Sequence, residues 1–314
     1  MNNLVITSGN ANKKLAEDIA SYLNINLCDT FVGRFNNGET QVMINESVRG
    51  KDVFIVQPTC QPVNDNLMEL LIMIDACKRA SASSVNAIIP YYAYSRQDRK
   101  TRGREPISAK LVANLLQAAG CNRVITVDLH AGQIQGFFDI PVDHLTAIPV
   151  LAKYFIEQGY KNNPNVVVVS PDLGGVTRAR KLADLLHSSI AIIEKRRPKP
   201  GVAEVMNIIG DVKDKIAIIV DDIVDTAGSL CEGAKALQDH GAKQVLACCS
   251  HGILTNPALE RITNSCIEQL IITDTIPLQE KNDKIKVLTM SELIARVLMH
   301  IQMHRSVSEV LDSQ

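Results

Sequence analysis

Short apolar runs alternate along the chain with longer segments in which apolar residues recur at helical spacing. The short runs predict strands at residues 4–7, 53–57, 85–89, 123–127, 166–170, 190–193, 216–220, 244–249, 270–273 and 285–288. The amphipathic segments predict helices at residues 66–80, 107–119, 150–158, 230–240 and 291–304. Strands that alternate with helices in this way predict an α/β fold, with mainly parallel sheets flanked by helices.

The strand pattern runs twice, which predicts two similar α/β halves. Residues 124–130 and 218–224 both contain an apolar run that ends in acids, and Pro149 lies near the midpoint of the chain. We expect an N-terminal domain at residues 1–147 and a C-terminal domain at residues 148–314, with the last helix a candidate to pack on the N-terminal half. In such sheets, ligands bind at the carboxyl ends of the strands.

Residues 217–229, AIIVDDIVDTAGS, carry the strongest functional signal. A predicted buried strand ends in Asp221 and Asp222, Asp225 follows, and the small-residue turn TAGS opens a predicted helix. Backbone N–H groups at a helix N-terminus bind anions, and small residues let a phosphate come close. An ordinary N-cap explains one acid. Three acids repel one another unless a cation or a hydroxyl lies among them, so the segment indicates a phosphorylated sugar.

Two basic segments follow predicted strands. Residues 90–105, PYYAYSRQDRKTRGRE, hold five cations, and residues 194–201, EKRRPKPG, have the proline and glycine content typical of a mobile loop. A solvated surface loop is the common explanation of a basic run alone. Here the preceding strand and the tyrosines favour an ordered loop, and arginine suits phosphate because its planar guanidinium bonds two oxygens at once.

Two further strand ends carry candidate metal ligands. His130 follows Asp128, and Asp172 lies in the turn SPDLGG at residues 170–175. An isolated histidine is usually structural, but one histidine with oxygen ligands fits Mg²⁺ that is also held by water and phosphate oxygens. Together with the basic loops, these strand ends indicate transfer from a nucleotide to a sugar phosphate. The motifs GxxxxGK[ST] and GxGxxG are absent, which argues against P-loop and Rossmann proteins.

Composition narrows the class of partner. The 314 residues are 46% apolar and carry a net charge of −1, so no overall field favours nucleic acid or a membrane. Aromatic residues make up only 4%, too few for a platform that stacks single-stranded bases. The chain has no apolar run near the roughly 18 residues of a membrane span, no signal-peptide pattern and no close CxxC pair. We therefore expect a cytoplasmic protein with reduced cysteines.

The motifs and their order resemble the ribose-phosphate pyrophosphokinase family over nearly the whole chain. The matching segments are GRFNNGE (33–39), NDNLMELL (64–71), YSRQDRK (94–100), VDLHAGQIQGFF (127–138), SPDLGG (170–175), EKRRP (194–198), VDDIVDTAGS (220–229) and TIPL (275–278). The resemblance implies two phosphoribosyltransferase-like domains and transfer of the β,γ-diphosphoryl group of ATP to the anomeric hydroxyl of ribose 5-phosphate. The products are AMP and 5-phosphoribosyl 1-diphosphate, a precursor for nucleotide biosynthesis.

The resemblance also implies a role for each candidate residue. The catalytic residues would be Lys195 and Arg197, and the magnesium ligands would be His130 and Asp172. ATP would be bound by Arg96 and Gln97 and, from a neighbouring subunit, by Phe35, Asn37, Gly38 and Glu39. Ribose 5-phosphate would be bound by Arg197, Asp221, Asp222, Asp225, Thr226, Ala227, Gly228 and Ser229.

Family members are usually homohexamers regulated by phosphate and ADP. The corresponding regulatory segments here contain Ser47, Arg49, Arg102, Gln135 and residues 306–308. Two departures from the usual family motifs are FNNGE for FSDGE, which places Asn37 at an acidic position, and DTAGS for DTGGT, which places Ala227 and Ser229 in the sugar-phosphate loop. Both keep small or hydrogen-bonding side chains, so we expect binding to survive.

Two other functions stay open at this point. A phosphoribosyltransferase uses the same sugar-diphosphate loop but needs neither the basic loop at residues 94–100 nor two full halves. A non-catalytic homologue that only assembles with active subunits would not need Lys195, Arg197, His130 and the intact acidic loop.

Overall fold

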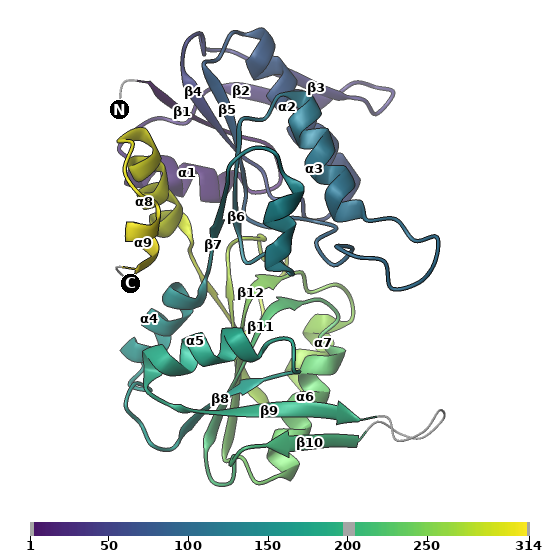
Figure 1. The fold of residues 1–314 in the computed structure, drawn as a ribbon, viewed down its shortest axis with the longest axis vertical. Coiled ribbons are helices and arrows are strands. Elements are labelled where there is room, and N and C mark those ends of the chain that lie inside the picture. Colours follow the sequence, from purple (N-terminus) through teal and green to yellow (C-terminus); the bar gives the residue numbers. More distant parts are fainter. Residues whose placement is uncertain (1–2, 197–204, 313–314) are drawn as a thin grey trace. The chain divides into compact units, whose positions relative to one another are not determined.

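The apolar runs form two main parallel sheets in a computed structural model that describes residues 3–196 and 205–312 (Figure 1). The chain divides into two compact units. The first unit comprises Met1–Thr146, Thr275–Pro277 and Thr289–Gln314, and the second comprises Ala147–Asp274 and Leu278–Leu288. The predicted α/β class is confirmed, because in both units helices cover parallel strands.

The first unit contains a five-stranded parallel sheet. Its order is β1 (Leu4–Ser8), β4 (Asp52–Val56), β5 (Ser84–Ile89), β6 (Arg123–Val127) and β7 (Val142–Leu145). The helical segments of this part are α1 (Lys13–Tyr22), α2 (Val63–Arg79), α3 (Ser108–Ala119) and the short 3-10 helix η1 (Gly132–Phe137). The strands β2 (Thr30–Arg34) and β3 (Thr40–Ile44) form a separate antiparallel hairpin.

The end of the chain returns to the first unit. Helices α8 (Ser291–Gln302) and α9 (Ser308–Asp312) belong to it, and α8 packs against α1. The face of α8 that carries Leu293, Ile294, Val297 and Leu298 is buried. An amphipathic helix needs an apolar partner, and α1 offers Leu15 and Ile19 on its own buried face.

The second unit contains a seven-stranded sheet in which only the edge strand β10 is antiparallel. Its order is β10 (Val205–Ile209), β9 (Ser189–Arg196), β8 (Val166–Ser170), β11 (Ile216–Val224), β12 (Gln244–Gly252), β13 (Ile267–Thr273) and β14 (Ile285–Leu288). Its helices are α4 (Ile148–Glu157), α5 (Val176–Leu186), α6 (Gly228–Asp239) and α7 (Ala258–Asn264). All four residues before Ser170 in β8 are buried valines, as expected for a strand covered on both faces.

The repeat is present, but the structure corrects how its halves align. Strand order β1-β4-β5-β6-β7 in the first unit corresponds to β8-β11-β12-β13-β14 in the second. The counterpart of β11 is therefore β4, and not β6, the strand of residues 124–130 that was paired with it on sequence. Acids directly follow strands in both sheets, at Asp128 after β6 and at Asp225 and Asp274 after β11 and β13, so an acid after a strand does not identify which strands correspond.

One predicted strand end is also wrong. The strand expected to stop at Val220 continues to Val224, so Asp221 and Asp222 are strand residues. Asp221 pairs in register with Cys249 and Ile223 with His251 on β12. Paired backbone groups outweigh the low strand preference of aspartate in this position. The consequence is that the two carboxylates are fixed by a sheet, and not by a loop.

Candidate active site

Two acids lie at the carboxyl end of β11 in the second unit, and an arginine lies between them. Arg178, on the first turns of α5, places Nη1 3.3 Å from Asp221 Oδ1 and 3.3 Å from Asp222 Oδ1. The backbone N–H of Asp222 also donates to Asp221 Oδ1 at 2.8 Å. The side chain of Asp222 is only 7% exposed, that of Arg178 19% and that of Asp221 30%. One cation therefore faces two largely buried carboxyl groups.

Burial and the neighbouring Asp222 raise the pKa of Asp221 from 3.8 to about 8, and Arg178 opposes this shift. The pair consequently holds a proton near neutral pH while no ligand is present. Such a pair can accept hydrogen bonds from a vicinal diol once it is ionised, and can donate one while it is protonated. This arrangement suits sugar hydroxyls.

The raised pKa predicts a pH-dependent stability. Between about pH 4 and pH 8 the folded protein keeps a proton on Asp221 that the unfolded chain has released, so the free energy of unfolding falls as pH rises through this window. Because the Asp221 side chain is 30% exposed, we expect a loss of only roughly 1–2 kcal/mol. Asp221→Asn should flatten this dependence in urea unfolding measured from pH 5 to pH 8.5.

The matched control for this prediction is Asp214→Asn. Asp214 is exposed in the turn before β11, at the opposite end of the same strand. Its substitution should leave the slope of the wild type unchanged. An Asp221→Asn protein that lost stability with pH as steeply as the wild type would contradict the assignment of the titration to this carboxyl.

The small-residue turn after β11 leads directly into α6. Ala227 is the N-cap residue, with a left-handed φ of 57°, and Gly228 and Ser229 form the first turn of the helix. Thr226 and Ser229 are exposed, whereas Ala227 is 4% exposed. The N–H groups of a first helical turn have no partner within the helix. The turn is therefore an anion-binding arrangement beside the two carboxylates.

The neighbouring strand end supplies the other wall of this site. The turn at residues 171–175 follows β8, which is adjacent to β11, and α5 then leads to β9 whereas α6 leads to β12. Such a divergence of two connections is the usual place for ligands in open α/β sheets. Within the turn, Asp172 Oδ1 accepts from the N–H of Gly175 at 2.8 Å and the Ser170 hydroxyl donates to the Asp172 carbonyl at 2.7 Å. The sequence-predicted metal ligand Asp172 thus also caps its own turn.

Lys195 lies on the antiparallel pair β9–β10, at the carboxyl end of the sheet, where the two acids also lie. Strands β8 and β9 are parallel, and Ser170 at the end of β8 is opposite Ile192. Lys195, opposite Met206 of β10, lies three residues further along β9, about 10 Å past the end of β8 at the usual rise per residue. Arg197, the other predicted catalytic residue, lies outside the described residues.

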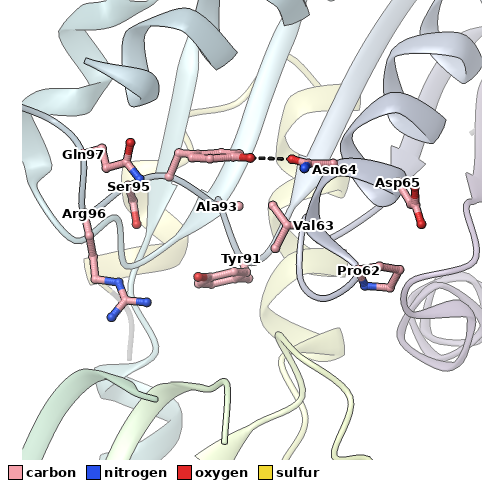
Figure 2. Close-up of a pocket in the computed structure, with 10 residues that line it drawn as sticks. Pro62, Val63, Asn64, Asp65, Tyr91, Ala93, Ser95, Arg96 and Gln97 are labelled. Carbon is pink, nitrogen blue, oxygen red and sulfur yellow. Dashed lines mark hydrogen bonds between the residues drawn. The ribbon is translucent and has the colours of Figure 1, made fainter. Parts of the chain in front are cut away.

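The first unit carries a cavity of about 450 Å³ at the carboxyl end of β5 (Figure 2). The start of α2 forms one wall with Pro62, Val63, Asn64 and Asp65, and the loop after β5 forms the other with Tyr91, Ala93, Tyr94, Ser95, Arg96 and Gln97. The Tyr94 hydroxyl donates to Asn64 Oδ1 across the cavity, and Gln97 Oε1 accepts from Ser108 Oγ at 2.5 Å. Both predicted ATP-binding residues of this loop, Arg96 and Gln97, line the cavity.

The other four predicted ATP-binding residues lie in the turn of the β2–β3 hairpin. Phe35 N–H donates to the Glu39 carbonyl at 2.8 Å, Gly38 N–H donates to the Phe35 carbonyl at 2.8 Å, and Asn37 Oδ1 accepts from Glu39 N–H at 3.2 Å. The Phe35 side chain is 50% exposed. An ion pair of 2.7 Å joins Arg34 on this hairpin to Asp65 on the cavity wall. The hairpin turn is exposed, and the strand residue just before it is joined to the cavity wall.

The site formed by the acid pair and the turn after β11 is called the β11 site. Its counterpart in the first unit lies between the ends of β1 and β4, and side chains of the protein itself fill it. Glu69 accepts from the N–H and side-chain amide of Asn10, at 2.5 and 2.9 Å, and from Gln57 Nε2 at 2.8 Å. Gly9 is required there, because a Cβ would collide with Gln57 and Glu69. This carboxylate and amide occupy the gap between the ends of β1 and β4, so the sugar-phosphate candidate belongs to the second unit.

His130, the remaining predicted metal ligand, is exposed after β6, in the first unit. Its neighbour Leu129 donates its N–H to Nε2 of His144, at 2.9 Å. Among the described residues no group of three or more histidine, cysteine, aspartate or glutamate side chains could hold a metal ion. A magnesium ion at His130 or Asp172 therefore needs water and phosphate oxygens as its other ligands, which is the usual coordination of Mg²⁺.

Three side chains at the β11 site were not predicted from the sequence. Arg178 contacts the acid pair, Thr255 donates to Asp225, and Arg261 donates to the Thr226 carbonyl. Each is at least 30 positions from its partner in the chain, so no local pattern links it to the acids or to the turn. Only the spacing SPDLGG-x-x-R gave a signal for Arg178, because a residue in the first turn of α5 faces the end of the neighbouring strand.

Comparison with known proteins gives a consistent family. A model described as the N-terminal domain of ribose phosphate pyrophosphokinase matches residues 4–120, and one described as phosphoribosyl synthetase-associated domain matches residues 194–312. Two curated relatives named ribose-phosphate pyrophosphokinase are 58% identical over 311 residues, from Clostridium tetani, and 60% identical over 301 residues, from Clostridium perfringens. The alignment with the Clostridium tetani protein covers 98% of this chain and 97% of that protein. The alignment with the Clostridium perfringens protein covers 95% of this chain and 94% of that protein.

A solved structure agrees with these relatives. The crystal structure of phosphoribosylpyrophosphate synthetase from Mycobacterium smegmatis is similar with a TM-score of 0.90 and 42% identity, over 96% of this chain and 99% of that one. In the part of the chain that the structure describes, no helix has the length and apolar character that a membrane crossing requires.

Proposed function

From the premise that this chain belongs to the ribose-phosphate pyrophosphokinase family, we propose which of its residues bind each substrate. The family reaction is the reaction of this chain: it transfers the β,γ-diphosphoryl group of ATP to the anomeric hydroxyl of ribose 5-phosphate. The oxygen of that hydroxyl bonds to the β-phosphorus of ATP, the bond from the β-phosphorus to the AMP oxygen breaks, and the hydroxyl proton is released.

The observation that carries the assignment is the acid pair beside an open helix N-terminus in the second unit. Asp221 and Asp222 bind the ribose hydroxyls, and Asp225, Thr226, Ala227, Gly228 and Ser229 surround the 5-phosphate. The support is geometric: two largely buried carboxyl groups at the end of β11 are followed at once by the first turn of α6. An anion is favoured at that turn by free N–H groups and the helix dipole, and hydroxyls are favoured at the carboxylates.

ATP binds at the cavity of the first unit, with Arg96 and Gln97 on its phosphates or base and with Phe35, Asn37, Gly38 and Glu39 contributed by a neighbouring subunit. The exposed hairpin turn, with a half-exposed Phe35, supports the second part, since an exposed aromatic ring on an ordered turn is suited to stacking on a partner's ligand. The chain accordingly acts as a homo-oligomer, which we propose to be a hexamer regulated by phosphate and ADP.

Substitution of Arg96 tests the ATP assignment. Arg96→Ala should raise KM for ATP about 10- to 100-fold, because it removes a charge-assisted contact to phosphate, and should leave KM for ribose 5-phosphate within twofold. Arg79→Ala is the control: Arg79 is an exposed arginine at the far end of α2 from the cavity. Equal ATP affinity in the two variants would refute the role of Arg96.

His130 and Asp172 are proposed as the protein ligands of Mg²⁺, each in its own unit. The bound ion would neutralise charge on the transferring phosphoryl oxygens. His130→Ala should raise the Mg²⁺ concentration for half-maximal activity about tenfold, with KM for ribose 5-phosphate unchanged at saturating Mg²⁺. His240→Ala, at an exposed histidine after α6, should behave as the wild type. Identical Mg²⁺ titrations for the two variants would exclude His130 as a ligand.

The protein's own cations neutralise the remaining charge. Negative charge spreads over the phosphoryl oxygens during attack at the β-phosphorus, so catalysis is mainly positioning and charge stabilisation. Lys195 and Arg197 are proposed to contact those oxygens. Asp225, the first residue of the sugar-phosphate loop, is proposed to orient the attacking hydroxyl. For the localisation we propose the cytoplasm, where the nucleotide substrate is abundant.

A further inference from the structure

The segment between β12 and α7 contacts the sugar-phosphate loop, which comprises residues 225–229. The connection between β12 and α7 lies directly against the end of β11. The N–H groups of Ile253 and Leu254 both donate to the Val224 carbonyl, at 2.9 and 3.1 Å. Leu254 has a left-handed φ of 52°, so the chain turns sharply at this point. The turn brings the residues that follow it, Thr255 to Arg261, beside the loop.

Thr255 fixes the carboxylate of Asp225. Its hydroxyl donates to Asp225 Oδ1 at 2.5 Å. One carboxylate oxygen thereby accepts a hydrogen bond from a neighbouring segment, which restricts the rotation of the Asp225 side chain. A hydrogen bond of this kind matters most where the carboxylate must meet a substrate group within a fraction of an ångström.

Arg261 fixes the backbone of the loop. Its Nη1 donates to the Thr226 carbonyl at 3.0 Å. In a trans peptide the carbonyl and the following N–H point in opposite directions, so this bond directs the Ala227 N–H away from α7. A Cβ on Gly228 would lie 3.2 Å from the same Nη1. Glycine at 228 therefore makes room for the guanidinium as well as for a ligand.

We propose that Thr255 and Arg261 are positioning residues for ribose 5-phosphate: Thr255 aims Asp225 at the sugar, and Arg261 sets the loop that receives the 5-phosphate. The inference rests on the proposed function, because it assumes that residues 225–229 bind this substrate. Neither residue touches the reacting atoms. Their effect is on the binding of ribose 5-phosphate, and ATP binding in the first unit should be independent of them.

Substitution of Thr255 gives the sharpest test, because the two replacements differ by one hydroxyl. Thr255→Val removes the bond to Asp225 at nearly constant volume and should raise KM for ribose 5-phosphate about tenfold. Thr255→Ser retains the hydroxyl and should restore KM to within twofold of the wild type. KM for ATP should stay constant in both. The control is Thr263→Val, at an exposed threonine on α7 whose hydroxyl donates to Leu259.

Arg261→Gln should also raise KM for ribose 5-phosphate about tenfold while kcat changes less than threefold. Unchanged KM in both Thr255→Val and Arg261→Gln, or an equal rise in KM for ATP, would overturn the proposal. If Arg261→Gln fails to fold, the Thr255 pair decides alone. Asp222→Asn, measured in the same assay, separates failure of the proposed function from failure of the positioning role. A normal KM for ribose 5-phosphate in Asp222→Asn would contradict the assignment of this substrate to the site. A raised KM in Asp222→Asn together with a normal KM in Thr255→Val would contradict only the positioning role.

Discussion

Replacement of Lys195 by alanine should lower kcat about 10²- to 10³-fold, while the affinity for ribose 5-phosphate stays close to that of the wild type. Lys195 lies on the β9–β10 ribbon, past the end of β8 and at the carboxyl end of the second sheet. Residue 195 is therefore at the end of the sheet where the β11 site lies. A cation that meets the phosphoryl oxygens mainly in the transition state affects kcat more than substrate binding.

The measurement is a steady-state assay of AMP formation, combined with equilibrium binding of ribose 5-phosphate. Lys243→Ala serves as the control, because Lys243 is exposed next to the amino end of β12, at the opposite end of the strands from residue 195. A Lys195→Ala enzyme with nearly normal turnover would remove Lys195 from the mechanism. A variant that lost ribose 5-phosphate binding along with turnover would make it a binding residue.

Asp222→Asn should raise KM for ribose 5-phosphate about 100-fold. The Asp222 side chain is 7% exposed and points to Arg178, so its charge is held in a poorly solvated place where hydrogen bonds from ribose hydroxyls are strong. Asparagine keeps the shape and one acceptor oxygen but loses the charge and offers N–H groups to a cation and to hydroxyls. A 100-fold change corresponds to about 2.7 kcal/mol, which is within the about 1.5–3 kcal/mol that a single hydrogen bond to a charged group contributes.

The steady-state assay of AMP formation tests this prediction. The control is Asp214→Asn, because Asp214 lies in the exposed turn before β11. KM for ATP should remain within twofold in both variants. A KM for ribose 5-phosphate in Asp222→Asn equal to that of Asp214→Asn would refute the assignment of the acid pair to the sugar.

Local sequence patterns predicted the parts of the fold that depend on local chemistry. The valines of β8 and the periodic leucines of α2 both favour burial in an apolar core. The predicted strand at residues 166–170 is β8, and the predicted helix at residues 66–80 overlaps α2. The hairpin β2–β3 was not predicted, because its half-exposed strands lack an apolar run. Helix α1 was not predicted either, since two of the four residues on its buried face are alanines, which give a weak periodic signal.

The sequence also predicted the acidic residues of the candidate site, but not the groups that hold them. Asp221 and Asp222 were evident because three acids close together in the sequence repel one another unless a cation or a hydroxyl lies among them. Arg178, Thr255 and Arg261 reach the site only because neighbouring strands bring distant turns together. The filled crevice around Glu69 was invisible for the same reason: its three donors come from two separate segments. Tertiary pairing, and not residue type, decides such contacts.

The central claim is that the chain moves a diphosphoryl group as one unit, and phosphorus NMR of a single reaction mixture tests it most directly. The protein is incubated with ATP, ribose 5-phosphate and Mg²⁺, and the phosphorus-containing products are identified. The account predicts AMP and 5-phosphoribosyl 1-diphosphate in equal amounts, with two coupled diphosphate signals on the sugar. Formation of ADP with a sugar bisphosphate, or no AMP that depends on ribose 5-phosphate, would contradict it.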